Sequence, residues 1–142
     1  MGLIEKIKSW KRQDDAPATH RRGRLGEEAA KKHLRRNGLK FLAANFTAGR
    51  GEIDLVFRED DCLVFVEVKA RQEGGWTRPS AAVNARKRRL LTQCAFDYLR
   101  LLKNPAVKIR FDIVEVLLLD EAVAEVRHLP NVFTLTAPYR HG

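Results

Sequence analysis

The chain has 142 residues, 44% of them hydrophobic, and its 27 Lys and Arg outnumber its 18 Asp and Glu to give a formal net charge of +9. This length and this hydrophobic content suit a single domain with its own core. No apolar run approaches the roughly 18 residues of a membrane span and no export signal is visible, so we expect no membrane insertion and a cytoplasmic location. The basic excess favours an anionic partner such as nucleic acid, although a merely basic surface would give the same count.

The chain divides into three parts by composition. Residues 1–24 carry a few apolar positions at helical spacing and then Arg21-Arg22-Gly23-Arg24, which predicts a flexible basic N-terminal segment. Residues 25–135 alternate apolar segments with turn signals and predict the folded domain, and residues 136–142 form a C-terminal tail. A first helix is expected over 25–37, because Ala30 and Leu34 repeat at i, i+4 and Asn37-Gly38 supplies a stop.

Strands and one long helix account for the rest of the domain. Three short segments rich in β-branched and aromatic residues predict an antiparallel meander: 39–46, 52–57 and 62–70. A helix over 80–103 follows, with an apolar stripe that should face the sheet: Leu91, Cys94, Ala95, Tyr98 and Leu102. A fourth strand over 107–119 is reached across this helix, so it should run parallel to its neighbour, and a last strand should continue through Val126. The expected class is α/β, with a mixed sheet flanked by helices.

Charged residues interrupt the apolar strand segments. Asp54 lies in Gly51-Glu52-Ile53-Asp54-Leu55-Val56, and Glu67 and Lys69 lie in Leu63-Val64-Phe65-Val66-Glu67-Val68-Lys69. An ionised carboxylate among valines costs several kcal/mol or more unless a cation pairs with it. Side chains alternate along a strand, so we expect Glu52 and Asp54 on one face opposite Ile53, Leu55 and Phe57, and Glu67 and Lys69 on the face of Phe65.

A tight antiparallel pair can bring Asp54 beside Glu67, and two such carboxylates suit Mg²⁺ or Mn²⁺. Lys69 adds a positive charge that can position a water or stabilise charge on a phosphate under attack. The same residues would also arise from a surface Glu–Lys pair, which is worth under about 1 kcal/mol.

Two further residues are candidates for the same site. Glu27 precedes Ala30 and Leu34 on the sheet-facing stripe of the first helix, and Lys87 precedes Leu91 on the stripe of the long helix. For Glu27 the alternative is an acidic residue favoured by the helix dipole, and for Lys87 it is a solvated basic face. Glu52 would support the preceding turn or orient Lys69. We assign Asp112 a structural role.

Basic residues gather around the long helix. From Trp76 to Lys103 the chain holds seven basic residues against one acidic residue, Asp97. Together with the basic N-terminal segment they predict a surface that tracks phosphates, with Trp76 available for stacking. The residues assigned to nucleic-acid binding are Arg22, Arg24, Arg71, Arg78, Arg86, Arg88 and Arg89.

The motifs also carry a resemblance. Asp54 followed thirteen residues later by Glu67-Val68-Lys69 is similar to the signature of the PD-(D/E)XK nuclease superfamily. Over residues 21–133 the chain resembles the YraN family of bacterial proteins, which is similar to archaeal Holliday junction resolvases. The positions that carry this resemblance are Gly26-Glu27, Ala30, Asn45, Gly51 to Leu55, Leu63 to Lys69, Arg71, Ala82-Val83, Lys87 and Arg110-Phe111-Asp112.

The resemblance implies a restriction-endonuclease-like αβββαβ core over residues 25–135 and cleavage of DNA that leaves a 5′-phosphate. The implied catalytic residues are Glu27, Asp54, Glu67 and Lys69. Asp54, Glu67 and the carbonyl of Val68 would hold Mg²⁺ or Mn²⁺, and Glu52 and Lys87 would support the site.

Two other interpretations stay open. The chain could be a nucleic-acid-binding module that keeps the fold without turnover, or a structural or interaction protein whose carboxylates and lysines form buried ion pairs. A homodimer would suit a junction substrate, but no segment identifies an interface, and no base-reading motif separates DNA from RNA.

Overall fold

The computed structural model describes residues 18–72 and 84–133 of the chain. In chain order their elements are α2 (Ala18–Arg36), β1 (Lys40–Ala48), β2 (Gly51–Glu59), β3 (Cys62–Gln72), α3 (Ala85–Leu101), β4 (Lys108–Leu119) and β5 (Ala122–Leu129). The predictions for residues 1–17, for Trp76 and Arg78, and for the tail at 136–142 lie outside the described residues.

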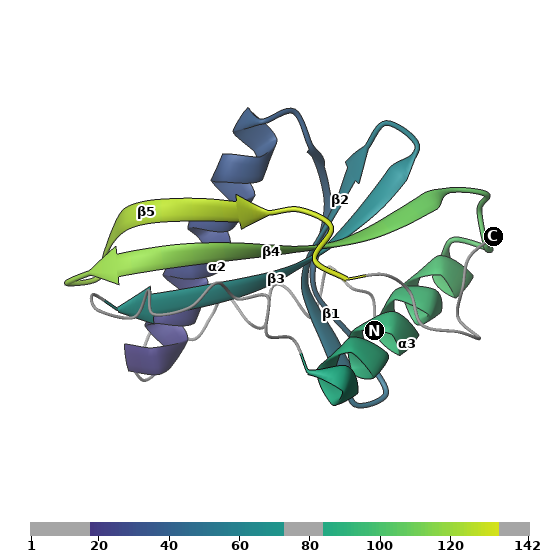
Figure 1. Cartoon of the computed structure of the whole chain (residues 1–142), viewed down its shortest axis with the longest axis horizontal. Helices are drawn as coiled ribbons and strands as arrows, with labels where there is room; N and C mark the ends of the chain where they lie inside the picture. Colours follow the sequence, from purple (N-terminus) through teal and green to yellow (C-terminus); the bar gives the residue numbers. More distant parts are fainter. Residues whose placement is uncertain (1–17, 73–83, 134–142) are drawn as a thin grey trace.

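The strands form one mixed sheet in the order β1-β2-β3-β4-β5. The β1–β2, β2–β3 and β4–β5 pairs are antiparallel, and the β3–β4 pair is parallel. The predicted meander and the predicted parallel fourth strand are therefore confirmed. Figure 1 shows the β1–β2 hairpin crossing the β3–β5 part of the sheet, with α2 packed against β3, β4 and β5 and α3 against β1 and β2.

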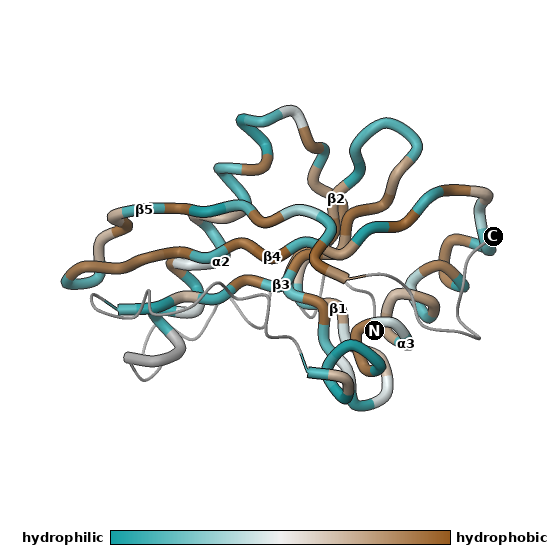
Figure 2. Tube along the Cα trace, viewed as in Figure 1, coloured by the Kyte–Doolittle hydropathy of each residue, from teal (hydrophilic) through white to brown (hydrophobic). Residues whose placement is uncertain are grey.

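Each helix covers its own hydrophobic cluster. Leu91, Cys94 and Tyr98 of α3 pack with Phe65 and Phe111, whereas Ala30 and Leu34 of α2 pack with a separate set from β2, β3 and β4. Figure 2 shows hydrophobic residues along β3 and β4, and hydrophilic residues in the turn between β2 and β3. No helix in the described ranges is long and apolar enough to cross a membrane.

The helix boundaries differ from the predicted ones. Helix α2 begins at Ala18, so the predicted start of the first helix at residue 25 is wrong. Its end is as predicted, because Gly38 adopts φ 92° and the Leu39 N–H donates back to the carbonyl of Leu34.

Helix α3 is shorter than predicted at both ends. It begins at Ala85 after an Asn84 N-cap and ends at Leu101, where residues 80–103 were expected. Leu102 lies beyond the helix with 44% of its surface exposed, so its assignment to the buried stripe is wrong, and Leu99 is buried at 1% exposure. The left-handed backbone of Lys103 and Asn104 stops the helix before the predicted stripe is complete.

Candidate active site

Strand β2 separates from β3 at the predicted site. Their pairing runs from the turn only as far as Leu55 opposite Val66, after which β2 continues beside β1 and β3 continues beside β4. Asp54 and Glu67 are the first residues beyond the last pair. The Asp54 carboxylate spans the opening and accepts a 2.7 Å hydrogen bond from the Val68 N–H. The divergence in Figure 1 therefore places polar groups where the ladder of β2 and β3 ends.

The side chains of β2 do not alternate as predicted. Ile53 packs in the cluster beneath α3, whereas Leu55 and Phe57 pack in the cluster beneath α2, so the prediction that all three share one face is wrong. Asn45 of β1, which lies between the residues that pair with Ile53 and Leu55, has φ 53°. This left-handed residue lies beside Asp54, at the point where the alternation of the side chains reverses.

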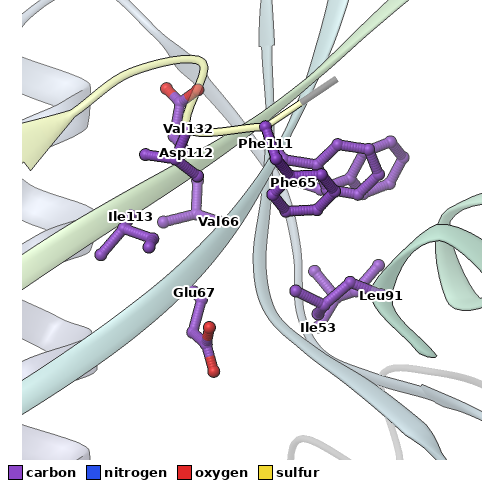
Figure 3. Close-up of a pocket in the computed structure, with 10 residues that line it drawn as sticks. Ile53, Phe65, Val66, Glu67, Leu91, Phe111, Asp112, Ile113 and Val132 are labelled. Carbon is purple, nitrogen blue, oxygen red and sulfur yellow. The ribbon is translucent and has the colours of Figure 1, made fainter. Parts of the chain in front are cut away.

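The alternation in β3 is as predicted. Phe65 packs beneath α3 and Val66 beneath α2, so Glu67 lies on the α3 side. Its side chain is only 12% exposed, and Oε1 lies 2.6 Å from the ammonium of Lys87. Its other oxygen, Oε2, is buried and has no hydrogen-bond partner among the described residues. Figure 3 shows the carboxylate directed away from the rings of Phe65 and Phe111.

The first turn of α3 presents Lys87 to this carboxylate. The side chain of Asn84 accepts a 2.8 Å hydrogen bond from the Lys87 N–H and so begins the helix at this point. Lys87 is 48% exposed along its side chain, and the hydrogen bond to Glu67 raises the pKa of its ammonium. Lys87 contacts Glu67, but it is exposed like its neighbours Arg86 and Arg88 rather than buried as the predicted stripe implied.

Two glycines allow the helices to approach the site closely. A Cβ on Gly26 would lie 2.9 Å from the Cβ of Ala70 on β3, and a Cβ on Gly51 would lie 2.9 Å from the carbonyl oxygen of Leu90 on α3. Real Cβ atoms do not approach other atoms this closely. Each glycine directly precedes a glutamate of the predicted site, so close packing positions Glu27 and Glu52.

Glu27 is partly buried, whereas Glu28 is exposed, as the helical stripe predicts. The Asn45 side-chain amide donates a 3.4 Å hydrogen bond to Glu27. Burial, followed by repulsion from Asp54, raises the pKa of Glu27 to about 8. These surroundings therefore favour the protonated form of Glu27.

Asp54 is perturbed in the same direction. Burial raises its pKa to about 7; the hydrogen bond from Val68 opposes this shift, and the charges of Glu67 and Glu52 add to it. Three glutamates from three elements, Glu27, Glu52 and Glu67, thus interact electrostatically with Asp54. A cation placed among them would relieve this repulsion.

An open hollow of about 250 Å³ lies over these groups. It is lined by Arg50, Gly51, Glu52, Asp54, Glu67, Lys87, Leu90 and Leu91. Alternation places Lys69 on the face of Glu67, further along β3, where it forms no ion pair with another described residue. The structure thus brings Glu52, Asp54, Glu67 and Lys87 together, with Lys69 and Glu27 adjacent rather than in the lining.

The donor set fits a hard divalent cation in part. No group of three or more His, Cys, Asp or Glu side chains forms a metal cluster within the described ranges. The carboxylates of Asp54 and Glu67 nevertheless line the hollow. The carbonyl of Val68 should point the same way, because the N–H and C=O of one strand residue point to the same side and the Val68 N–H donates to Asp54. The unpartnered Oε2 of Glu67 supplies a further buried oxygen. Oxygen ligands of this kind suit Mg²⁺ or Mn²⁺.

Asp112 has the structural role that the sequence predicts. It is 1% exposed and accepts hydrogen bonds from Arg110, from the ring of His128 at 2.7 Å, and from the Asn131 N–H at 2.9 Å. Although burial alone would raise its pKa, these bonds together hold the pKa below the usual range. Asp112 therefore ties β4 to β5 and the segment after it.

Sequence reasoning missed one buried carboxylate. Glu115 of β4 is 1% exposed and pairs in register with Lys69. Its setting, Val114-Glu115-Val116, repeats the pattern of Val66-Glu67-Val68 and was the signal that could have identified it.

The predicted phosphate-binding residues occupy different settings. Arg86, Arg88 and Arg89 are exposed in the first turns of α3, whereas Arg22 and Arg24 are partly buried in α2. Arg71 lies on β3, where its Nε is buried without a hydrogen-bond partner among the described residues. None of these arginines lines the hollow, where the arginine is Arg50 of the turn between β1 and β2.

These features define a mixed α/β protein with an acidic site where two strands of its sheet diverge. A family model described as "Uncharacterised protein family UPF0102" matches residues 26–116. The chain therefore belongs to the UPF0102 family, which is the YraN family of the sequence resemblance. Its matched region contains Glu27, Asp54, Glu67, Lys69 and Lys87.

Similar proteins occur in distant bacteria. A UPF0102 protein of Porphyromonas gingivalis is 44% identical over 115 residues, which cover 80% of this chain and 84% of that protein. One from Solibacter usitatus is 40% identical over 135 residues, covering 94% and 99%. One from Clostridium beijerinckii is 33% identical over 114 residues, covering 80% and 93%.

Proposed function

We propose that this protein is a metal-dependent endonuclease that hydrolyses phosphodiester bonds of DNA. The observation that carries the proposal is the surplus of carboxylates where β2 leaves β3. Glu67 is paired with Lys87, but neither Asp54 nor Glu27 forms an ion pair with a described residue. Burying ionised carboxylates without a cation costs free energy, and a divalent ion that prefers oxygen ligands would offset this cost.

In this proposal Asp54, Glu67 and the carbonyl of Val68 hold Mg²⁺ or Mn²⁺. The ion would lower the pKa of a bound water and polarise a phosphoryl oxygen. Lys69 orients the attacking water and stabilises negative charge on the phosphate, and Glu27 supplies a further oxygen or a proton at the edge of the site. The water oxygen bonds to phosphorus, the bond from phosphorus to the leaving sugar oxygen breaks, and that oxygen takes up a proton.

The beginning of α3 supports a nucleic-acid substrate. Its first turn has no acidic residue and instead carries Arg86, Lys87 and Arg88. Positive side chains at a helix N-terminus oppose the helix dipole, and a bound phosphate would relieve both the dipole and the side-chain charges. This surface borders the hollow through Lys87, which suits a backbone phosphate beside the carboxylates.

A structural role remains the strongest competitor, because the Lys87–Glu67 contact is an ion pair of the kind that interpretation requires. It does not account for Asp54 and Glu27, whose pKa values stay raised by burial and by neighbouring carboxylates although Val68 and Asn45 donate hydrogen bonds to them. In a purely structural role, the Lys87–Glu67 ion pair would gain no stability from placing Asp54 and Glu27 beside it without ion pairs to described residues.

The test is cleavage of a labelled panel containing a four-way junction, a flap, a single strand and a duplex, with Mg²⁺ or Mn²⁺. Wild type is compared with Glu67→Ala, Lys69→Ala and the control Glu28→Ala, which removes an exposed acid next to Glu27. Cleavage by wild type and the control, abolished in both other variants and by EDTA, supports the proposal. Binding without cleavage would favour the non-catalytic module, and neither binding nor cleavage would favour the structural role.

A further inference from the structure

Lys87 occupies the position of a cation in the carboxylate site. Its ammonium lies 2.6 Å from Glu67 Oε1, across a hollow that Asp54 and Glu52 also line. No other basic side chain of the described residues forms an ion pair with these three carboxylates. Two basic residues, Arg50 and Lys87, line the hollow, and Lys87 is the one that pairs with a carboxylate there.

The contact satisfies the site incompletely. Lys87 contacts one oxygen of Glu67, while Oε2 stays buried without a hydrogen-bond partner among the described residues. A single ammonium also leaves Asp54 without an ion-pair partner among residues 18–72 and 84–133. A divalent ion carries twice the charge and accepts several oxygens at once, so it would satisfy groups that Lys87 leaves unsatisfied.

Lys87 can leave at low cost. Its side chain is 48% exposed and comes from the first turn of α3, so it can turn into solvent without disturbing the core. Partly exposed ion pairs of this kind contribute little net stability, because the side chain must be held in one geometry while water solvates the charge well.

We propose that Lys87 is a built-in counter-ion of Glu67, which a divalent cation displaces, so that Lys87 and the cation compete for one carboxylate. Lys87 therefore weakens metal binding in the absence of substrate and turns into solvent when metal binds. This inference rests on the proposed metal site and adds to it a residue that sets the metal affinity.

The first test is Mn²⁺ binding by titration calorimetry, without nucleic acid, to wild type, Lys87→Gln and the control Arg88→Gln. Both variants remove one positive charge from the same turn, but Arg88 is exposed and forms no ion pair with a described residue. We expect Lys87→Gln to bind Mn²⁺ roughly fivefold more tightly than wild type, the ratio that corresponds to about 1 kcal/mol. Arg88→Gln should change the affinity much less.

A second test follows the lysine itself in the wild-type protein. Amine acetylation is measured by mass spectrometry with and without Mn²⁺, with the exposed Lys103 as the internal reference. Release from Glu67 exposes the amine and removes the hydrogen bond that raises its pKa, so Lys87 should react faster with Mn²⁺ present while Lys103 does not change.

The outcomes separate this inference from the nuclease proposal. Equal Mn²⁺ affinity of Lys87→Gln and Arg88→Gln, with unchanged labelling of Lys87, overturns the competition even if the protein cleaves DNA. Tighter binding and faster labelling without cleavage support the competition and count against the nuclease. Absence of Mn²⁺ binding in all three proteins overturns both.

Discussion

The close contact between α2 and β3 makes Gly26→Ala an informative substitution. The new Cβ would lie 2.9 Å from the Cβ of Ala70 and 3.6 Å from Cγ1 of Val68. The Ala70 Cβ is fixed to the backbone, so the helix or the strand has to move. Overpacking of this kind costs about 1–3 kcal/mol, whereas alanine in place of glycine inside a helix gains about 1 kcal/mol.

Gly23 provides the matched control, because it lies in the same helix and its Cβ would meet no atom within 4 Å. Gly23→Ala should raise the free energy of unfolding by up to about 1 kcal/mol, and Gly26→Ala should fall below that variant by about 1–3 kcal/mol. Urea denaturation at neutral pH measures both. If Gly26→Ala is as stable as Gly23→Ala, the glycine is not what allows α2 to approach β3, and our account of how Glu27 is positioned fails.

Three further substitutions test other parts of the structure. Asp112→Asn should lower the free energy of unfolding by about 3–5 kcal/mol at pH 7. Because the folded-state pKa of Asp112 is depressed, its contribution is present above its ordinary pKa of 3.8 and lost as pH falls through the folded pKa, so urea denaturation should give a smaller difference in acid. Glu27 is raised from 4.5 to about 8, so wild type loses stability as pH rises between these values, and Glu27→Gln should melt higher than wild type at pH 9 but not at pH 4. Gly51→Ala, with its Cβ 2.9 Å from the Leu90 carbonyl, should cost about 1–3 kcal/mol in the same urea assay, and an unchanged midpoint would contradict the close approach of β2 to α3.

Sequence patterns predicted the sheet well because its strands have strong local signals. Short turns between 39 and 70 required antiparallel neighbours, and the helix before β4 required a parallel one, as observed. The start of α2 was missed because Ala18 to Arg24 offers no apolar repeat and no clear cap. Helix formation there is seen only in the structure.

The sequence predicted the site residues that interrupt apolar segments with charge. It did not predict the feature of the site that depends on backbone geometry. Glu67 and Lys87 meet as the strand and helix patterns indicate. The reversal between Ile53 and Leu55 was not predictable from alternation, and it occurs beside the left-handed Asn45 on the neighbouring strand. Propensity alone does not tell when an asparagine within a strand adopts that conformation.

The most direct test of the central claim is Mn²⁺ binding by titration calorimetry to wild type, Asp54→Asn and Asp60→Asn. Asp60 is an exposed aspartate in the turn at the other end of β2, so its variant removes the same charge far from the strand divergence. Our account predicts that wild type and Asp60→Asn bind Mn²⁺ alike and that Asp54→Asn loses this binding. Equal binding by Asp54→Asn and wild type, or no binding by wild type, would contradict a metal site at the divergence of β2 and β3.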